Sequence, residues 1–256
     1  MFARILVACF ATSILAAQPN PGSVVTHSLP ISGPYEVYSV IDPSGNVYQT
    51  TGVRRGDYSA TPGAAETQFG GGAPVAYCLF TPAGPYPCDD GIIAKADPSG
   101  NTIFVTFLGA PKGADASAIA VDPSGNVYVA GTAGASFPTT ANSAISTSAT
   151  STTFAAKLSA DGSKFLYATY LPDTMASPTH IAADSQGNAY IAGFTDYSVG
   201  DVTEHHACVI KLSADGSTIV YSKVLAGTNS ELQEPCSPMQ RATLTSLATP
   251  ILPTSP

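Results

Sequence analysis

The densest group of metal-ligating side chains in this chain lies in one short segment, which contains Glu204, His205, His206 and Cys208. Alternate side chains of an extended strand point to the same side, so Glu204, His206 and Cys208 could begin a zinc site there. A closed zinc site uses four ligands, however, and the sequence offers no second group of His and Cys nearby. We therefore expect no metal here, and predict that Cys208 opens a strand behind a solvated connector.

An acidic turn recurs along the chain. Asp42, Asp97 and Asp122 each begin the sequence Asp-Pro-Ser-Gly-Asn, and Asp184 begins the variant Asp-Ser-Gln-Gly-Asn. A calcium loop needs six to eight oxygen ligands, usually from several carboxylates, whereas each of these turns has a single acid. An aspartate that accepts nearby amides, a proline that presets φ and a glycine that tolerates positive φ explain the pattern as a hairpin turn. We expect turns and no bound calcium.

Signatures of catalysis are scarce. The sequence contains no Gly-x-Ser-x-Gly elbow, no His-Glu-x-x-His and no phosphate-binding Gly-x-x-x-x-Gly-Lys. We therefore predict no catalytic residue and no cofactor. The alternative is a secreted lyase or hydrolase, in which His180 meets acidic residues at the mouth of a channel. The acids that could take this role are Asp89, Asp90, Asp173 and Glu204.

The first residues have the form of an export signal. Arg4 precedes the apolar run Ile5–Ala17, which ends in small residues before Gln18. This pattern is typical of a secretory signal peptide, and the run is too short to anchor the chain in a bilayer. We predict a signal peptide at residues 1–17, cleaved after Ala17 or one residue earlier, and a lead-in segment at 18–34. The chain is then secreted, periplasmic or on the cell surface.

Export into an oxidising compartment permits disulfide bonds. The cysteines outside the signal peptide are Cys78, Cys88, Cys208 and Cys236, and four cysteines allow three pairings. Cys78 and Cys88 bracket a Pro- and Gly-containing turn, which favours a local bond between them. Cys208 with Cys236 is then the remaining pair.

The same region holds the best candidate for a binding loop. Residues 73–88 form an insertion that the later repeats lack, and loops on a rigid scaffold commonly carry function. An insertion that was merely tolerated is the alternative. The side chains expected to bind are Tyr77, Phe80, Tyr86, Asp89 and Asp90.

The overall composition excludes several classes of protein. Charged residues make up 11% of the chain and the formal net charge is −8. A coiled coil, a long helical bundle or a charged disordered tail needs far more Glu and Lys. The acidic balance also argues against nucleic acid as a partner, since such binders are basic.

Internal repeats then define the elements that position these residues. One hairpin pattern starts at Glu36, Ser117 and Thr179, and a second starts at Ile92, Phe154 and Cys208. Each is a run rich in Val, Ile, Tyr and Phe, interrupted by an Asp- and Gly-containing turn, which predicts two strands. The two patterns alternate, so two hairpins make a unit of four strands.

The size of the side chains changes across each unit. The first strands carry small residues, such as Ala118 and Ala182, whereas the last strands carry Phe104, Tyr167 and Tyr221. A blade of a β-propeller needs this gradient, because it narrows towards the central axis. A β-sandwich or a β-solenoid is the alternative. We predict an all-β fold, a β-propeller with four-stranded antiparallel blades.

The middle unit carries a specific set of motifs in order. These are Asp-x-x-Gly-Asn-x-Tyr-x-x-Gly from Asp122, Phe137-Pro138-Thr139-Thr140, Ala-Lys-Leu-Ser-Ala-Asp-Gly-Ser from Ala156, and Tyr-x-x-Tyr-Leu from Tyr167. The combination resembles the bacterial SBBP-type β-propeller repeat, an exported, NHL-like repeat, and the resemblance runs from about Glu36 to Leu225. It implies an exported or cell-surface propeller and supplies no catalytic residues.

The repeats account for three blades, at residues 35–109, 117–172 and 178–226, followed by a Pro/Ser/Thr-rich tail without the pattern at 227–256. Closed propellers have about four to eight blades, so three form an incomplete, open propeller. Apolar faces would then stay uncovered, and a truncated chain or self-association through the open edges would explain this. The function we expect is an exported, non-enzymatic interaction module for a protein or glycan, without an integral membrane span.

Overall fold

The computed structural model describes residues 36–53, 58–70, 89–134, 136–148, 153–199 and 202–225. These residues form twelve strands and no helix, arranged as three separate four-stranded antiparallel sheets. The strand order in each sheet follows the chain, so every sheet is a simple meander. The prediction of an all-β, open propeller with four-stranded blades is confirmed.

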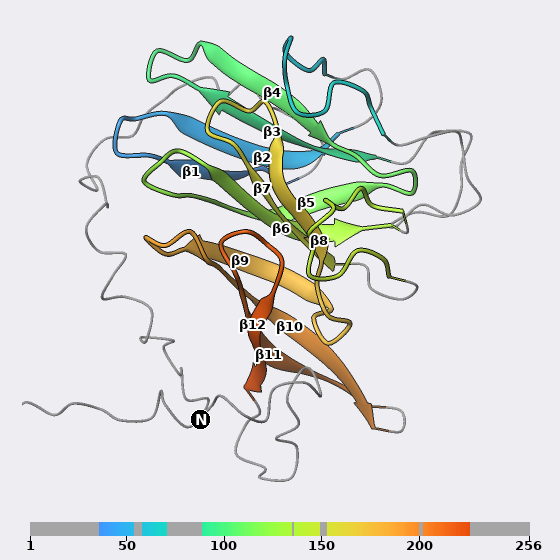
Figure 1. Cartoon of the computed structure of the whole chain (residues 1–256). Coiled ribbons are helices and arrows are strands. Elements are labelled where there is room, and N and C mark those ends of the chain that lie inside the picture. Colours follow the sequence, from blue (N-terminus) through green and yellow to red (C-terminus); the bar gives the residue numbers. More distant parts are fainter. Residues whose placement is uncertain are drawn as a thin grey trace, which may run out of the picture.

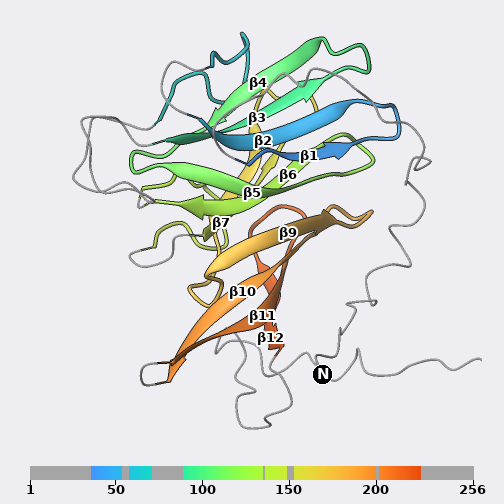
Figure 2. The same cartoon turned by 180° about the vertical axis from the view of Figure 1, so that it is seen from behind.

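Each sheet corresponds to one blade, and Figures 1 and 2 place blade 2 between the other two. Blade 1 consists of β1 (Tyr38–Ile41), β2 (Val47–Val53), β3 (Asp90–Ala96) and β4 (Thr102–Leu108). Blade 2 consists of β5 (Ala114–Val121), β6 (Val127–Ala133), β7 (Thr153–Leu158) and β8 (Phe165–Tyr170). Blade 3 consists of β9 (Ser177–Ala183), β10 (Ala189–Val199), β11 (Val202–Leu212) and β12 (Ile219–Leu225).

The first hairpin of every blade closes through the predicted aspartate turn. In blade 1, the Asp42 amide donates to the Asn46 carbonyl, and the Gly45 amide donates to the Asp42 carbonyl. Gly45 has a φ of 84°, a conformation that only glycine adopts without strain. The same two bonds recur in the turns that begin at Asp122 and Asp184. This local chemistry fixes the hairpin register before any contact between blades is made.

Two large apolar clusters hold neighbouring blades together. One joins Tyr48, Ile93 and Phe104 of blade 1 to residues of blade 2, and the other joins blades 2 and 3. The first strand of each following blade lies at the contact, since β5 touches β1, β2 and β3, while β9 touches β5 and β6. The small side chains of these inner strands therefore sit where the blades approach each other most closely, as the sequence pattern indicated.

A connector in each of the first two blades covers the outer edge of its sheet. In blade 2, the Thr140 amide donates to the Ala168 carbonyl on β8, and Phe137 packs against Phe154 and Tyr170. In blade 1, the Thr61 amide donates in the same way to Val105 on β4. A covered edge strand cannot pair with another chain, which protects these two blades.

Several predicted segments lie outside the described residues. They are the signal peptide 1–17, the lead-in 18–34, the tail 227–256, Cys78, Cys88 and Cys236, and the loop residues Tyr77, Phe80 and Tyr86. The disulfide pairing and the binding loop therefore stay predictions. In the part of the chain that the structure describes, no helix is long and apolar enough to cross a membrane.

Candidate functional site: polar clusters at the blade junctions

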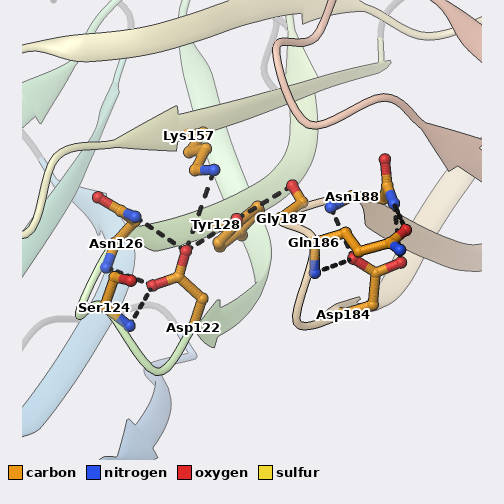
Figure 3. A network of polar contacts seen from close by, with 9 residues as sticks. All are labelled: Asp122, Ser124, Asn126, Tyr128, Lys157, Asp184, Gln186, Gly187 and Asn188. Atoms are coloured by element: carbon orange, nitrogen blue, oxygen red, sulfur yellow. Dashed lines mark hydrogen bonds and ion pairs between the residues drawn. The ribbon is translucent and has the colours of Figure 1, made fainter.

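A cluster of polar side chains surrounds the aspartate of each first hairpin, and the cluster of blade 2 is shown in Figure 3. Asp122 accepts hydrogen bonds from the Ser124 amide at 2.9 Å, from the Asn126 amide at 2.9 Å and from the Asn126 side chain at 2.8 Å. The hydroxyl of Tyr128 on β6 points back to the same carboxylate at 3.0 Å. The carboxylate is thus saturated by donors of its own hairpin.

A lysine from the third strand completes the cluster. Antiparallel pairing places Lys157 of β7 opposite Tyr128 of β6. The Lys157 ammonium lies 4.8 Å from the centre of the Tyr128 ring and 3.9 Å from the Asp122 carboxylate. Both charged side chains are buried, and a buried ion pair requires additional hydrogen bonds of the kind that surround Asp122.

The same arrangement of aspartate, tyrosine and lysine exists in all three blades. Blade 1 uses Asp42, Tyr48 and Lys95, and blade 3 uses Asp184, Tyr190 and Lys211. The lysine lies 4.9 Å from the ring centre in blade 1 and 4.8 Å in blade 3. The conserved geometry within one chain shows that the cluster is part of the repeat.

Burial and hydrogen bonding act in opposite directions on these aspartates. Burial opposes the ionisation of Asp42, but hydrogen bonds from Asn46, Tyr48 and Ser44 outweigh it and lower the pKa of the carboxyl. The balance is similar at Asp184, whose pKa is also lowered. Burial raises the pKa of the Tyr128 hydroxyl, and the Asp122 carboxylate raises it further. At neutral pH Asp42 and Asp184 are therefore ionised, and the hydroxyls of Tyr48 and Tyr128 are neutral.

The clusters reach across to the next blade. The Tyr128 hydroxyl also lies 3.1 Å from the carbonyl of Gly187, in the first turn of blade 3 (Figure 3). In blade 1, the Lys95 ammonium lies 3.5 Å from the carbonyl of Ala160, in the second turn of blade 2. The clusters of blades 1 and 2 thus tie their own hairpins to a turn of the following blade.

An aromatic ring makes a further contact at each junction. The ring of Phe104 on β4 rests on Gly162, so closely that a Cβ at this glycine would lie 2.5 Å from the ring. The ring of Tyr167 on β8 rests on Gly216 of blade 3 in the same way. The positive φ values of these turns, 75° and 72°, and the lack of a side chain both require glycine.

Blade 3 presents the same side chains without a following blade in the described part of the chain. By strand register, Tyr221 on β12 is the equivalent of Phe104 and Tyr167, because all three lie opposite the lysine of their blade. Phe104 and Tyr167 are buried, whereas Tyr221 is partly exposed. Leu225 is 45% exposed. We call Tyr190, Lys211, Tyr221 and Leu225 the open face of blade 3.

The family of the repeat follows from a comparison with known families. The family model described as SBBP, a beta-propeller repeat, matches residues 103–138. The chain carries an SBBP β-propeller repeat. A sequence comparison with curated proteins finds no match.

The matched SBBP repeat runs across a junction between blades. It begins within β4 of blade 1, contains β5 and β6, and ends in the connector of blade 2 at Pro138. The matched residues include Phe104, Asp122 and Tyr128, which are the residues that form the junctions. The matched repeat thus carries one side of two junction contacts, since their partners Gly162 and Gly187 lie outside the matched residues.

The segment considered for zinc lies on β11 of blade 3. Cys208 is buried in the core and His205 is exposed, but both lie inside β11, which begins at Val202, so the prediction that Cys208 opens the strand behind a solvated connector is wrong. The His205 imidazole pairs across the strands with Asp196 of β10 at 2.7 Å, a contact that the sequence did not indicate. Among the described residues, no group of three His, Cys, Asp or Glu side chains could hold a metal.

The residues considered for catalysis are engaged in separate places. His180 on β9 is exposed, and its Nδ1 lies 3.0 Å from the Thr179 hydroxyl. Asp90 is buried in blade 1, where its carboxylate accepts a hydrogen bond from the Gly70 amide. Asp90 thus fastens the end of the connector at residues 58–70 to β3.

The lysines and tyrosines of the clusters are the residues that sequence reasoning missed. Lys95, Lys157 and Lys211 each stand at the same distance before the glycine of the second turn of their blade, but no role follows from this pattern. The signal that could have suggested a pair is the expected order of the strands, since each Lys lies on the strand that pairs with the Tyr strand. The connection to the next blade is not visible in any single repeat.

Proposed function

We propose that this chain is exported and acts outside the cytoplasm as a non-enzymatic interaction module, with the open face of blade 3 as its docking surface. The observation that carries the proposal is that Leu225 is exposed, whereas the leucines at the equivalent positions of blades 1 and 2 are buried. Leu225 is 45% exposed, while its equivalents by register, Leu108 and Leu171, are buried against the next blade. Exposed apolar surface of this kind, surrounded by polar groups, commonly marks an interaction site.

The chemistry of the open face supports a macromolecular ligand. Tyr190 and Tyr221 provide apolar rings with hydroxyl groups, and Lys211 provides a cation. A hydrogen bond to Tyr190 raises the pKa of Lys211, so the side chain is charged at neutral pH. Tyrosine is enriched in protein interfaces because it combines large contact area with a polar end. A protein, or a glycan that can stack on the rings, fits this surface.

The structural use of the polar groups supports a role without catalysis. The carboxylate of Asp122 accepts its hydrogen bonds from its own hairpin, and the Lys157 ammonium lies between that carboxylate and the Tyr128 ring. Groups held in this way stabilise turns and junctions. A secreted lyase or hydrolase with His180 at its centre remains the alternative, because His180 is exposed on an inner strand.

Export can be tested separately from binding. We expect residues 1–34, fused to an alkaline phosphatase reporter that folds only after export, to give active reporter in a bacterial host. The matched control begins after residue 17 and should give none. Equal activity of the two fusions would contradict export through this segment.

Binding and catalysis can be tested on one panel of purified acidic and neutral polysaccharides and surface proteins. We expect at least one member to bind without being cleaved, and Tyr221→Glu to abolish binding by placing a charge on the open face. Leu166→Glu adds the same charge at a position of blade 2 that is already 41% exposed, and should bind like the wild type. Cleavage of a polysaccharide that disappears in His180→Ala would instead establish the enzyme.

A further inference from the structure

We propose that the partner of the open face is blade 1 of a second copy of this chain, so that two chains join head to tail into a ring of blades. The inference rests on the proposed function, because it names the occupant of the same docking surface. Two observations support it. The two junctions inside the chain show which groups of a following blade contact the tyrosine, lysine and aromatic ring of the blade before it. The two turns of blade 1 carry the same groups, but no described blade precedes them.

A following blade supplies two carbonyl groups, which face the tyrosine and the lysine, and one glycine, against which the aromatic ring packs. Its first turn offers the glycine carbonyl to the tyrosine, as Gly187 does for Tyr128 at 3.1 Å. Its second turn offers a carbonyl to the lysine, as Ala160 does for Lys95 at 3.5 Å. The glycine of that second turn receives an aromatic ring, as Gly162 does from Phe104.

The open face of blade 3 carries the matching groups. Tyr190, Lys211 and Tyr221 have the same register within their sheet as Tyr128, Lys157 and Tyr167 have in blade 2. The Lys211 side chain is 21% exposed, compared with 9% for Lys157. Lys95 is also partly exposed although blade 2 follows it, so the vacancy beside blade 3 is indicated by Tyr221, which is partly exposed where Phe104 and Tyr167 are buried.

The turns of blade 1 carry the complementary vacancies. Gly125 and Gly187, in the first turns of blades 2 and 3, each lie against the tyrosine hydroxyl of the preceding blade, whereas among the described residues Gly45 lies only against Pro98 of its own blade. In the second turn, Gly100 is the equivalent of Gly162 and Gly216, because each follows the lysine of its blade by the same number of residues. In the part of the chain that the structure describes, no atom lies within 4 Å of a Cβ placed on Gly100, so no described ring rests there.

The inner strand of blade 1 is exposed on the same side. Ile119 and Val121 of β5 pack against the cluster shared with blade 1, and Ile181 and Ala183 of β9 do the same one junction later. Their equivalents on β1, Ser39 and Ile41, are exposed, Ile41 by 41%. Further out, blade 1 covers its own side with Tyr58, Ala60 and Phe69. The vacant surface is therefore the inner strand and the two turns, which are the parts that make the internal junctions.

The number of copies follows from closure. A head-to-tail contact between identical chains continues until the ring closes, and otherwise forms a fibre. Propellers close with about four to eight blades. Two copies of the three described blades provide six, which lies within this range, whereas three copies provide nine. In the closed ring Tyr221 of each chain rests on Gly100 of the other, Lys211 faces the carbonyl of Pro98, and Tyr190 faces the carbonyl of Gly45.

The test measures the mass of the purified protein by sedimentation, over a range of concentrations. We expect the wild type to sediment at twice the mass of one chain. Ile41→Lys places a charge against Tyr221 and Lys211 of the partner, and Tyr221→Glu buries a carboxylate over Gly100. Either change should raise the dimer dissociation constant by about a hundredfold or more, as an unpaired charge at an interface does. Leu166→Glu, on the middle blade, should leave it unchanged.

Mixing the two disrupted variants distinguishes this dimer from others. A ring formed by one chain with Ile41→Lys and one with Tyr221→Glu contains one native junction and one in which the new lysine faces the new glutamate. We therefore expect the mixture to dimerise although each variant alone does not. Circular dichroism of each variant checks that the sheets are intact, so that a folding defect is not taken for a lost contact.

Other occupants of the open face give different results, and each would overturn the inference. A dimer joined through two copies of blade 3 would ignore Ile41→Lys and would not be restored by mixing. A wild type that stays monomeric, with its own residues 1–35 or 226–256 over Tyr221, would show protection of β12 in hydrogen exchange at every concentration. A monomer that still binds the polysaccharide and protein panel through Tyr221 would refute the second copy while the proposed function stands. A dimer that binds no panel member would support the inference and would contradict the proposal that the open face binds a polysaccharide or a protein of the panel.

Discussion

The ring of Phe104 in blade 1 lies directly on Gly162 in the second turn of blade 2, and no side chain larger than hydrogen fits between them. Tyr167 and Gly216 repeat the contact between blades 2 and 3. Successive blades are thus aligned by an aromatic ring that fits a glycine, in addition to the apolar core. This relationship is specific to the junction, since it needs residues of two different repeats.

Replacing these glycines by alanine tests the contact. Gly162→Ala should reduce the free energy of unfolding by about 3 kcal/mol, because a positive φ costs alanine roughly 1–2 kcal/mol and overlap with a ring adds roughly 1–3 kcal/mol. Gly100→Ala, with a φ of 86° and open space around it, should show only the backbone cost. Urea unfolding checks both, in an Ile41→Lys background that keeps Gly100 free of a second copy. Equal losses would contradict a role for the ring.

Removing the Tyr128 hydroxyl tests the link between blades 2 and 3. Tyr128→Phe should reduce the free energy of unfolding by about 1.5–3 kcal/mol, since the hydroxyl is buried and serves both the Asp122 carboxylate and the Gly187 carbonyl. The control is Tyr190→Phe in monomeric protein, where the tyrosine is partly exposed and its hydroxyl bonds Asp184 of its own blade. We expect that variant to lose about 1 kcal/mol or less by the same measurement. A larger loss at Tyr190 would contradict the proposed difference between closed and open faces.

The second turns of blades 2 and 3 predict a loss of stability in acid. The Ser159 hydroxyl, together with the amide and hydroxyl of Ser163, lowers the pKa of Asp161 to about 2, and Ser213 and Ser217 do the same for Asp215. A lowered pKa means that the folded state favours the carboxylate, so the contribution is complete above the ordinary value of 3.8 and disappears as pH falls towards 2. Thermal unfolding between pH 5 and about 2 should show this decline.

The double variant Asp161→Asn, Asp215→Asn is the matched control for the loss of stability at low pH. Asparagine keeps the turn but does not titrate, so the melting temperature of the variant should fall less steeply below pH 4 than that of the wild type. Asp42, Asp97 and Asp184, whose pKa values are also lowered, preserve part of the slope. Identical slopes would show that the serine hydrogen bonds do not persist in solution.

Asp115 is expected to have the opposite effect on the pH dependence of stability. Burial on β5 and the nearby charge of Asp89 raise the pKa of this carboxyl, so its contribution to stability is greatest below the ordinary value and is lost as pH rises. Asp115→Asn should therefore melt at a higher temperature than the wild type at pH 7. The two should converge at about pH 3, where the aspartate is protonated. A variant that is less stable at pH 7 would contradict burial as the dominant influence.

Much of the fold could be predicted from single repeats. The turn that begins at Asp42 is specified by residues within one hairpin, because aspartate, proline and glycine each fix a local feature of the backbone. The alternation of small and large strands indicated which edge of each sheet lies inside. Both signals are local in sequence, so they can be recognised within a single repeat.

The candidate site was harder to predict, because its contacts are not local. Lys157 meets Tyr128 only through strand pairing, and Tyr128 meets Gly187 only when two blades pack together. The segment around His206 suggested a metal site because residue types that bind metals are close together in its sequence. In the structure the relevant partner of His205 is Asp196 on the neighbouring strand.

By itself the sequence determined the strands, the turns and the number of blades, since hydrogen bonds and side-chain periodicity within each hairpin decide these. Only the tertiary structure decided which face of each blade is covered. Tyr167 and Tyr221 occupy equivalent positions in their repeats, yet one is buried on a glycine and the other is partly exposed. The physical reason is that burial depends on a neighbouring blade, which no single repeat contains.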